Sequence, residues 1–367
     1  MRGCCVFNYN PLYRFPIYDE IGKKFEFDIY IGDSIFEQLK SFDVNKLTGF
    51  KGWLHAKKIF NSRFIFHTGL KPLFNSDYDT YIVSADSTLL VVWLLLLYAK
   101  LFKKRIYLWG HGLKKSVQRP LTRLIYKAFY KSATGVFLYN NYNVKNMLEL
   151  GCKKERLFVI HNSLDSHLHD SIYIQLKPSN IYRDHFNNDA PNIVFIGRIQ
   201  KRMKVDQLVS AVRLLKQRGF KVNLTLIGPV IDDSFSGVEE SERNNVWIYG
   251  ACYDEKMTSQ LLYDADLCVA PGTVGLTAIH SLSFGTPVIT HDNYSELGPE
   301  FEAIHDNLTG SFFHQDDITD LAEKMLIWLK TDSVSREEVR KCARQEIINN
   351  WHVDAQIRVL TKALEIL

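Results

Sequence analysis

The chain has 367 residues, of which 46% are hydrophobic and 23% are charged. This composition excludes a disordered protein, and the length favours two domains over one. The six cysteines show neither a pairing rhythm nor the spacing of zinc ligands, so we expect reduced thiols, no metal and no cofactor.

Positive charge is concentrated in the first half of the chain. Residues 1–190 contain 27 Lys and Arg against 16 Asp and Glu, whereas the remainder contains 18 against 25. Between Ser87 and Leu148 there are eleven basic residues and no acidic residue. This asymmetry favours an anionic partner such as a membrane surface, although an ordinary basic face would give the same pattern. Without a helix-turn-helix or an aromatic stacking motif, we expect no nucleic-acid partner.

The first half alternates strands and helices in chain order. Apolar runs that end in turn residues predict strands at 4–9, 26–33, 80–86, 105–111, 134–140 and 156–165. Their continuous apolar character is typical of parallel strands covered on both faces. The apolar run 89–99 is too short to span a bilayer, which takes about 20 residues. We interpret it as a buried helix, with shallow membrane contact through Trp93, Tyr98 and residues 103–105 as the alternative.

The second half restarts after a polar stretch at 166–190, which we interpret as a linker. Strands are predicted at 192–199, 221–229, 245–251 and 266–271, with helices at 205–219, 254–265 and 316–331. We therefore expect an α/β protein with two Rossmann-like domains, residues 1–180 and 181–350, and a final helix at 351–367.

Three loops that follow strands carry candidate site residues, because ligands of parallel sheets bind at the carboxyl ends of strands. Loop 196–206 gathers Arg198, Lys201, Arg202 and Lys204 before a helix. Cations there oppose the helix dipole, which indicates a bound anion such as a diphosphate, with ordinary surface cations as the alternative.

The second loop has Gly272 and Gly275 before a helix that begins near Leu276, where backbone N–H groups are exposed. In the third, His111 and Gly112 follow a strand, and His111 could equally be a structural histidine. Arg14 follows the first strand, where it would contact acceptor phosphate or sugar, although the neighbouring Tyr13 and Phe15 could equally be core residues.

The segments NIVFIGRI, LTLIGP, NVWIYGA, LYDADLCVAPG and HSLSFGTPVI, from Asn192 to Leu329, resemble the nucleotide-sugar domain of GT-B glycosyltransferases. The resemblance is to the retaining group called glycosyltransferase family 4, and the first half more loosely resembles the acceptor domain of that group. The resemblance implies two domains facing across a cleft, with a C-terminal helix that crosses back to the first domain.

The resemblance also implies roles for individual residues. Arg198 and Lys204 would stabilise the leaving diphosphate with Arg202 beside them, because Met203 stands at the usual lysine position. The backbone at Val274, Gly275 and Leu276 would hold the distal phosphate. His111 would line the cleft between donor and acceptor and join Arg198 and Lys204 as a catalytic residue. Arg14 and Gly112 would contact the acceptor.

Two positions depart from the family pattern. Gly272 and His280 stand where two glutamates usually contact the transferred sugar and the ribose of the donor. We assign both positions to donor binding and expect a changed specificity, since loss of a carboxylate acceptor changes what is bound. A deoxyribonucleotide donor, such as a dTDP-sugar, is the hypothesis that follows.

Together these features predict a retaining, metal-independent glycosyltransferase of the hexosyl type. It would move a sugar from a nucleotide-diphosphate donor to a lipid-linked surface polysaccharide or oligosaccharide, of the lipopolysaccharide O-antigen or capsule kind. We expect a cytoplasmic protein, peripheral to the anionic inner face of the membrane. The alternatives are a GT-B-fold nucleotide-sugar epimerase and a catalytically silent partner subunit.

Overall fold

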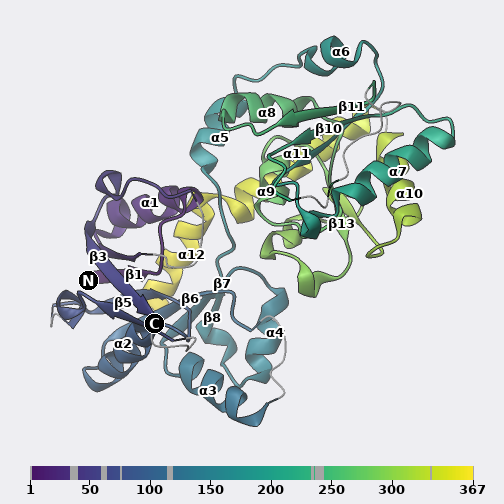
Figure 1. Cartoon of the computed structure of the whole chain (residues 1–367). Coiled ribbons are helices and arrows are strands. Elements are labelled where there is room, and N and C mark those ends of the chain that lie inside the picture. The colour runs from purple at the N-terminus through teal and green to yellow at the C-terminus, as the bar shows by residue number, and fades with distance from the viewer. Residues whose placement is uncertain are drawn as a thin grey trace. The chain divides into compact units, whose positions relative to one another are not determined.

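The computed structural model describes residues 2–33, 40–58, 64–74, 77–113, 119–232, 235, 244–330 and 333–366. The chain forms two compact units (Figure 1). The first unit contains Met1–Asp165 together with Val353–Leu367, and the second contains Ser166–His352.

The first unit is built on an eight-stranded sheet in the order β4-β3-β2-β1-β5-β6-β7-β8. All neighbouring strands are parallel except β3 and β4, which are antiparallel. The strands are β1 Gly3–Phe7, β2 Asp28–Gly32, β3 Phe50–Lys58, β4 Ile65–Thr68, β5 Thr80–Ser84, β6 Arg105–Gly110, β7 Gly135–Leu138 and β8 Leu157–Val159. The six strands expected in this half are present, and β3 and β4 extend the sheet beyond them.

Helices cover both faces of this sheet, which explains the continuous apolar strands. The helices are α1 Phe15–Phe25, α2 Leu90–Leu101, α3 Pro120–Lys131, α4 Tyr142–Glu149 and α12 Val353–Ile366. Residues of α2 and α3 belong to one hydrophobic core, and residues of α1 and α12 to another.

The C-terminal helix α12 packs in the first unit, beside α1 (Figure 1). Tyr107 of β6 donates its hydroxyl to the carbonyl of Ala363 at 3.0 Å, and Arg105 donates to the carbonyl of Leu364 at 2.9 Å. The predicted return of this helix to the first domain is therefore confirmed.

The second unit is built on a six-stranded parallel sheet in the order β11-β10-β9-β12-β13-β14. The strands are β9 Asn192–Ile196, β10 Asn223–Ile227, β11 Val246–Gly250, β12 Leu267–Ala270, β13 Val288–His291 and β14 Gly310–Phe313. The helices are α5 Ser166–Tyr173, α6 Ile181–Phe186, α7 Val205–Gln217, α8 Glu255–Asp264, α9 Leu276–Ser283, α10 Ile318–Leu329 and α11 Ser333–Glu346.

The stretch interpreted as a linker is part of the second unit. It contains α5 and α6, and the unit begins at Ser166 rather than after residue 180. Tyr182 of α6 is buried and donates its hydroxyl to the carbonyl of Leu261 at 2.6 Å, while His185 stacks on Trp247. The buried Tyr182 and the stacking of the exposed His185 on Trp247 thus hold a segment whose composition is polar.

Candidate functional site

Two loops, the basic loop after β9 and the glycine-rich loop after β12, meet at the carboxyl ends of these neighbouring strands. The backbone N–H of Gly272 donates to the carbonyl of Met203 at 3.1 Å, and that of Thr273 donates to the carbonyl of Arg202 at 3.3 Å. The structure therefore brings together the two loops that the sequence assigned to donor binding.

Gly272 is required by this close approach of the two loops. A Cβ atom at this position would lie 2.1 Å from the carbonyl oxygen of Arg202 and 2.6 Å from the Cα of Met203. Both atoms are backbone, so no rotamer change can remove the overlap. In this loop arrangement, position 272 cannot carry the glutamate that the family resemblance implies.

The cations of the first loop differ in exposure and in partners. Arg198 and Arg202 are exposed, whereas Met203 is buried in the core of the unit. Lys204 adopts a left-handed φ of 49° just before α7, and its Nζ lies 2.5 Å from a carboxylate oxygen of Asp316. The hydrogen bond from Lys204 is the main cause that lowers the pKa of Asp316. Lys204 thus lies at this edge of the sheet, whereas the Met203 side chain points into the core, and the role of Lys204 at a diphosphate stays a prediction.

Helix α9 begins beside these loops. The hydroxyl of Thr277 donates to the carbonyl of Ile196 at 3.1 Å, which fixes the first turn of α9 against the end of β9. Val274 is fully buried, and its carbonyl accepts from the N–H of Gly298 at 2.7 Å. Glu300, which sequence reasoning missed, is also buried, and its carboxylate lies beside Gly275. The start of α9 is therefore firmly placed, with its first backbone N–H groups at the carboxyl edge of the sheet.

His280 belongs to a cluster that sequence reasoning also missed. Its Nε2 lies 2.8 Å from Oε1 of Glu255, at the start of α8, and Nε2 of His169 on α5 lies 2.9 Å from the same oxygen. The two imidazole rings stack with centroids 5.1 Å apart and planes within 8°. We call these residues the His169–Glu255–His280 cluster.

The two imidazoles of this cluster favour the ionised form of the Glu255 carboxyl. Burial raises the pKa of Glu255, but the hydrogen bond from His169 and the neighbouring His280 outweigh it and hold the pKa well below its usual range. His280 thus faces a carboxylate of its own unit, and the ligand atoms of all three side chains lie within 4.8 Å of one another. This is a donor set that could hold a metal ion.

The candidate acceptor residues lie together in the first unit, after the ends of β1, β6 and β7. The guanidinium of Arg14 lies 4.8 Å from the ring centroid of Tyr139, and the exposed His111 packs on the same ring, also at 4.8 Å. Arg14 itself is buried; burial lowers its pKa, but Tyr139 and the neighbouring tyrosines raise it above the ordinary value. Contact of Arg14 with an acceptor stays a prediction.

Gly112 adopts a φ of 66°, and a Cβ there would lie 2.7 Å from a methyl carbon of Leu138. Asn143 donates its side-chain amide to the carbonyl of His111 at 2.8 Å. This turn therefore needs glycine, and the side-chain amide of Asn143 on α4 holds the carbonyl of His111 in place.

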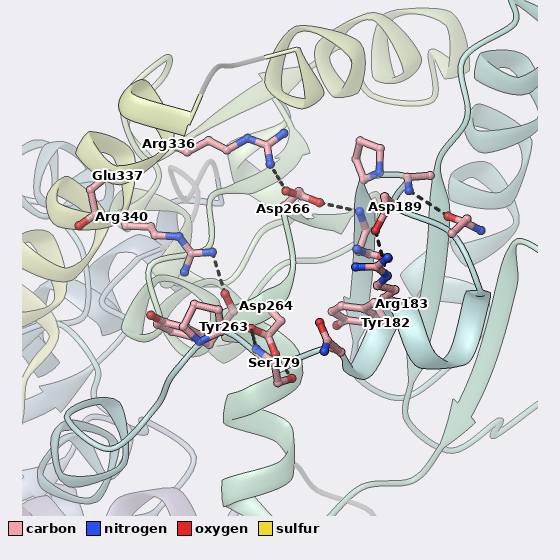
Figure 2. Close-up of a pocket in the computed structure, with 16 residues that line it drawn as sticks. Ser179, Tyr182, Arg183, Asp189, Tyr263, Asp264, Asp266, Arg336, Glu337 and Arg340 are labelled. Carbon is pink, nitrogen blue, oxygen red and sulfur yellow. Dashed lines mark hydrogen bonds and ion pairs between the residues drawn. The ribbon is translucent and has the colours of Figure 1, made fainter.

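A polar pocket of about 560 Å³ lies elsewhere, at the amino ends of β9 and β12 (Figure 2). Its walls include Arg183, Arg336 and Arg340. Figure 2 shows Arg183 paired with Asp189, Arg336 with Asp266, and Arg340 donating to the carbonyl of Tyr263. The charges of this pocket are therefore largely neutralised within its own walls, and it lies at the opposite end of the strands from the two donor loops.

Comparisons with known proteins show what the sequence and the fold resemble. Residues 190–331 match the family model described as Glycosyl transferases group 1. No curated protein sequence matches the chain significantly. Among solved structures, the UDP complex of Anabaena Alr3699/HepE is similar over 100% of both chains, with a TM-score of 0.72 and 13% identity.

Two further solved structures are similar. A glycosyltransferase from Rickettsia africae ESF-5 matches over 100% of both chains with a TM-score of 0.71 and 15% identity. The apo form of the lipopolysaccharide outer core galactosyltransferase WaaB matches over 100% of this chain and 99% of its own, with a TM-score of 0.66 and 13% identity. Residues 190–331 therefore match a glycosyl transferases group 1 domain, and the chain has the two-domain fold of GT-B glycosyltransferases.

Proposed function

We propose that the protein is a retaining glycosyltransferase that moves a sugar from a nucleoside diphosphate to a lipid-linked saccharide at an anionic membrane surface. The donor-binding part of this proposal rests on the contact between the two loops at the ends of β9 and β12. It places Lys204, with Arg198 and Arg202 on the same loop, next to the loop that leads into α9. Anions bind where cations and free backbone N–H groups converge.

In the proposed reaction, an acceptor hydroxyl attacks the anomeric carbon as the bond from that carbon to the diphosphate breaks. Arg198 and Lys204 stabilise the negative charge that develops on the leaving diphosphate. The first N–H groups of α9 bind the distal phosphate, and the leaving phosphate takes the proton of the acceptor hydroxyl. In the first unit, His111 and Gly112 contact the acceptor.

Supporting this donor class, solved structures of HepE contain UDP and UDP-glucose, and the matching family is one of glycosyl transferases. The ion pair of Lys204 with Asp316 fits a lysine that exchanges a carboxylate partner for a phosphate on binding. We therefore propose a nucleoside diphosphate sugar as the donor, in a transfer for which we expect no metal.

The first unit offers a surface for the membrane half of the proposal. Helices α2 and α3 contact each other through Trp93 and Phe129, whose ring centroids lie 5.0 Å apart. Away from the core, these helices and the residue after α2 expose large apolar side chains, which are Leu94, Leu97, Leu101, Phe102, Leu121, Leu124 and Ile125. We call this set the apolar patch.

Cations border the apolar patch. Lys100, Lys103, Arg119, Lys127 and Lys131 are exposed on the same helices or at their ends, whereas Lys114 and Lys115 lie outside the described residues. Exposed apolar side chains and cations on the same helices fit the interface of an anionic bilayer, where each cation contributes about 1 kcal/mol. Among the described helices, none reaches the combination of length and apolarity that crossing a membrane requires. We therefore propose peripheral attachment.

The donor half is tested by nucleotide release and by nucleotide binding. Removing one charge-assisted contact costs about 1.5–3 kcal/mol, so Arg198→Ala and Lys204→Ala should each weaken nucleoside diphosphate binding roughly ten- to a hundredfold. Arg218→Ala is the matched control, because Arg218 is a surface cation just after α7 whose nearest carboxylate, that of Glu323, lies 4.0 Å away. Equal binding by all three variants would contradict the proposal.

The same assay separates the alternative functions. Turnover of the donor without any acceptor would identify an epimerase. Absence of nucleotide binding by the folded wild-type chain would identify a catalytically silent subunit.

The membrane half is tested by sedimentation with phospholipid vesicles. We expect binding to anionic vesicles and little binding to zwitterionic ones, with loss of binding in the variant Leu97→Asp/Leu124→Asp. Ile174→Asp, a change at an apolar side chain that is 83% exposed in the second unit, should have no effect. Binding that survives the paired substitution would exclude the apolar patch as the attachment surface.

A further inference from the structure

The His169–Glu255–His280 cluster joins three helices that are distant in the sequence. His169 comes from the middle of α5, Glu255 is the first residue of α8, and His280 lies in the second turn of α9. All three belong to the second unit. A pattern search along the chain cannot find this set, because no two members are close in sequence.

The chemistry of the cluster is that of a zinc ligand set. Zinc prefers imidazole nitrogens and carboxylate oxygens in tetrahedral sites, with bonds of about 2.0–2.2 Å. Such bonds place ligand atoms about 3.3–3.5 Å apart. The two Nε2–Oε1 separations, 2.8 and 2.9 Å, need only a small outward movement, and all three ligand atoms already lie within 4.8 Å of one another.

Hydrogen bonding alone does not account for the cluster. Nε2 of His280 is buried and, among the described residues, has no acceptor in hydrogen-bonding alignment, although Oε1 of Glu255 is only 2.8 Å away. A buried polar atom that is close to its neighbour but misaligned with it is unfavourable. A cation between the two atoms would satisfy both.

Two other paired histidines of this unit lie nearer the surface, and a third, the buried His352, lies 3.2 Å from a carboxylate oxygen of Asp170. His305 pairs with Glu346 and His314 pairs with Asp292, and these imidazoles are 46% and 79% exposed. The side chains of His169 and His280 are 5% and 14% exposed, and they share one carboxylate. Two buried imidazoles that converge on a single anion are more typical of a metal site than of a surface ion pair.

We propose that His169, Glu255 and His280 bind one zinc ion through Nε2, a carboxylate oxygen and Nε2, respectively. A water molecule takes the fourth position, because the side chain of Glu255 is 38% exposed and solvent reaches it. The ion fastens α5 to the helices that follow β11 and β12. It makes His280 a metal ligand, which replaces the ribose contact expected from the sequence.

This site goes beyond the proposed transfer reaction and does not rest on it, because Arg198, Lys204 and the start of α9 are not ligands. Zinc binding can therefore be measured without a nucleotide sugar. A failure of zinc binding would leave the proposed function standing, and the reverse also holds.

The first experiment titrates the chelator-stripped full chain with Zn²⁺ in competition with a chromophoric chelator. We expect one equivalent to bind, and His169→Gln and Glu255→Gln each to weaken binding at least tenfold. His305→Gln, which removes a histidine from a simple carboxylate pair, should bind as the wild type does. If the chain does not bind one equivalent of Zn²⁺ saturably, or if all these variants bind Zn²⁺ with equal affinity, the proposal is overturned.

The second experiment separates loss of a ligand from loss of folding. His169→Cys keeps a metal-binding atom but removes the imidazole, so it should bind Co²⁺ and add a thiolate-to-cobalt absorption band that the wild type lacks. Circular dichroism checks that the variant is folded. A folded His169→Cys protein without this band would show that His169 is a hydrogen-bonding residue and would overturn the site.

Discussion

The contact between the two donor loops makes Gly272→Ala a sharp test of the site geometry. The added Cβ would meet the carbonyl oxygen of Arg202 at 2.1 Å, against about 3.5 Å for an ordinary contact, so the loops would have to separate by roughly 1 Å. That separation breaks the hydrogen bonds of Gly272 to Met203 and of Thr273 to Arg202. At about 0.5–1.5 kcal/mol each, their loss lowers the free energy of unfolding by about 1–3 kcal/mol.

Urea denaturation measures this loss, and nucleotide titration measures its effect on the donor site. We expect a lower denaturation midpoint with an unchanged slope, together with weaker nucleoside diphosphate binding, because Lys204 follows the displaced backbone directly. Gly52→Ala is the control: a Cβ there has its nearest neighbour, a ring carbon of Tyr30, at 3.9 Å. A Gly272→Ala protein that matched Gly52→Ala in stability and matched wild type in nucleotide affinity would refute the close approach.

Three further predictions concern specificity, pH and stability. If the departures at 272 and 280 favour a deoxyribonucleotide, dTDP should bind more tightly than UDP in a competition assay, and tighter UDP binding would exclude that preference. The hydrogen bond to Glu346 is the main cause that raises the pKa of His305, so its stabilisation is complete below the unfolded value of about 6.5 and is lost as pH rises through the folded pKa. His305→Gln should therefore be less stable than wild type at pH 5.5, with the difference vanishing by about pH 9 in thermal melts. Asn223→Ala removes four side-chain hydrogen bonds of a buried amide at the start of β10 and should cost about 1–3 kcal/mol in urea denaturation.

Much of the fold could be predicted from periodicity alone. Strands such as β5, β6 and β9 are continuous apolar runs ended by turn residues, and they appear where the pattern placed them. The loops at the carboxyl ends of β9 and β12 could also be predicted to meet, because parallel strands present those ends at one edge. The sequence-based prediction missed the two strands at one edge of the first sheet, β3 and β4. In β3 the less exposed positions 50, 52, 54 and 56 alternate with exposed ones, but charged residues such as Lys51 and Lys57 interrupt the continuous apolar run by which the other strands were identified.

The rest of the site depends on contacts between distant segments. The polar stretch 166–190 was interpreted as a linker because its few apolar residues, such as Ile172 and Tyr182, have no helical rhythm strong enough to identify it. Because of that interpretation, neither His169 nor the His169–Glu255–His280 cluster was identified from the sequence. The carboxylate of Glu255 gave no signal either, since a glutamate in the first turn of a helix is ordinary helix chemistry. Only the packing of α5, α8 and α9 makes these residues a site.

The family pattern itself offers the last test, because the two absent glutamates are absent for different physical reasons. At 272 a side chain is excluded by backbone, whereas at 280 the place opposite the imidazole is already taken by Glu255. His280→Glu would therefore set two carboxylates against each other in a partly buried position and should lower the free energy of unfolding by about 1–3 kcal/mol at pH 7. Glu255→Gln removes one of the two charges, so the double variant should lose less stability than the sum of the single variants. Urea denaturation of the four proteins in the presence of EDTA gives this coupling free energy, and additive losses would show that position 280 does not face Glu255 in solution.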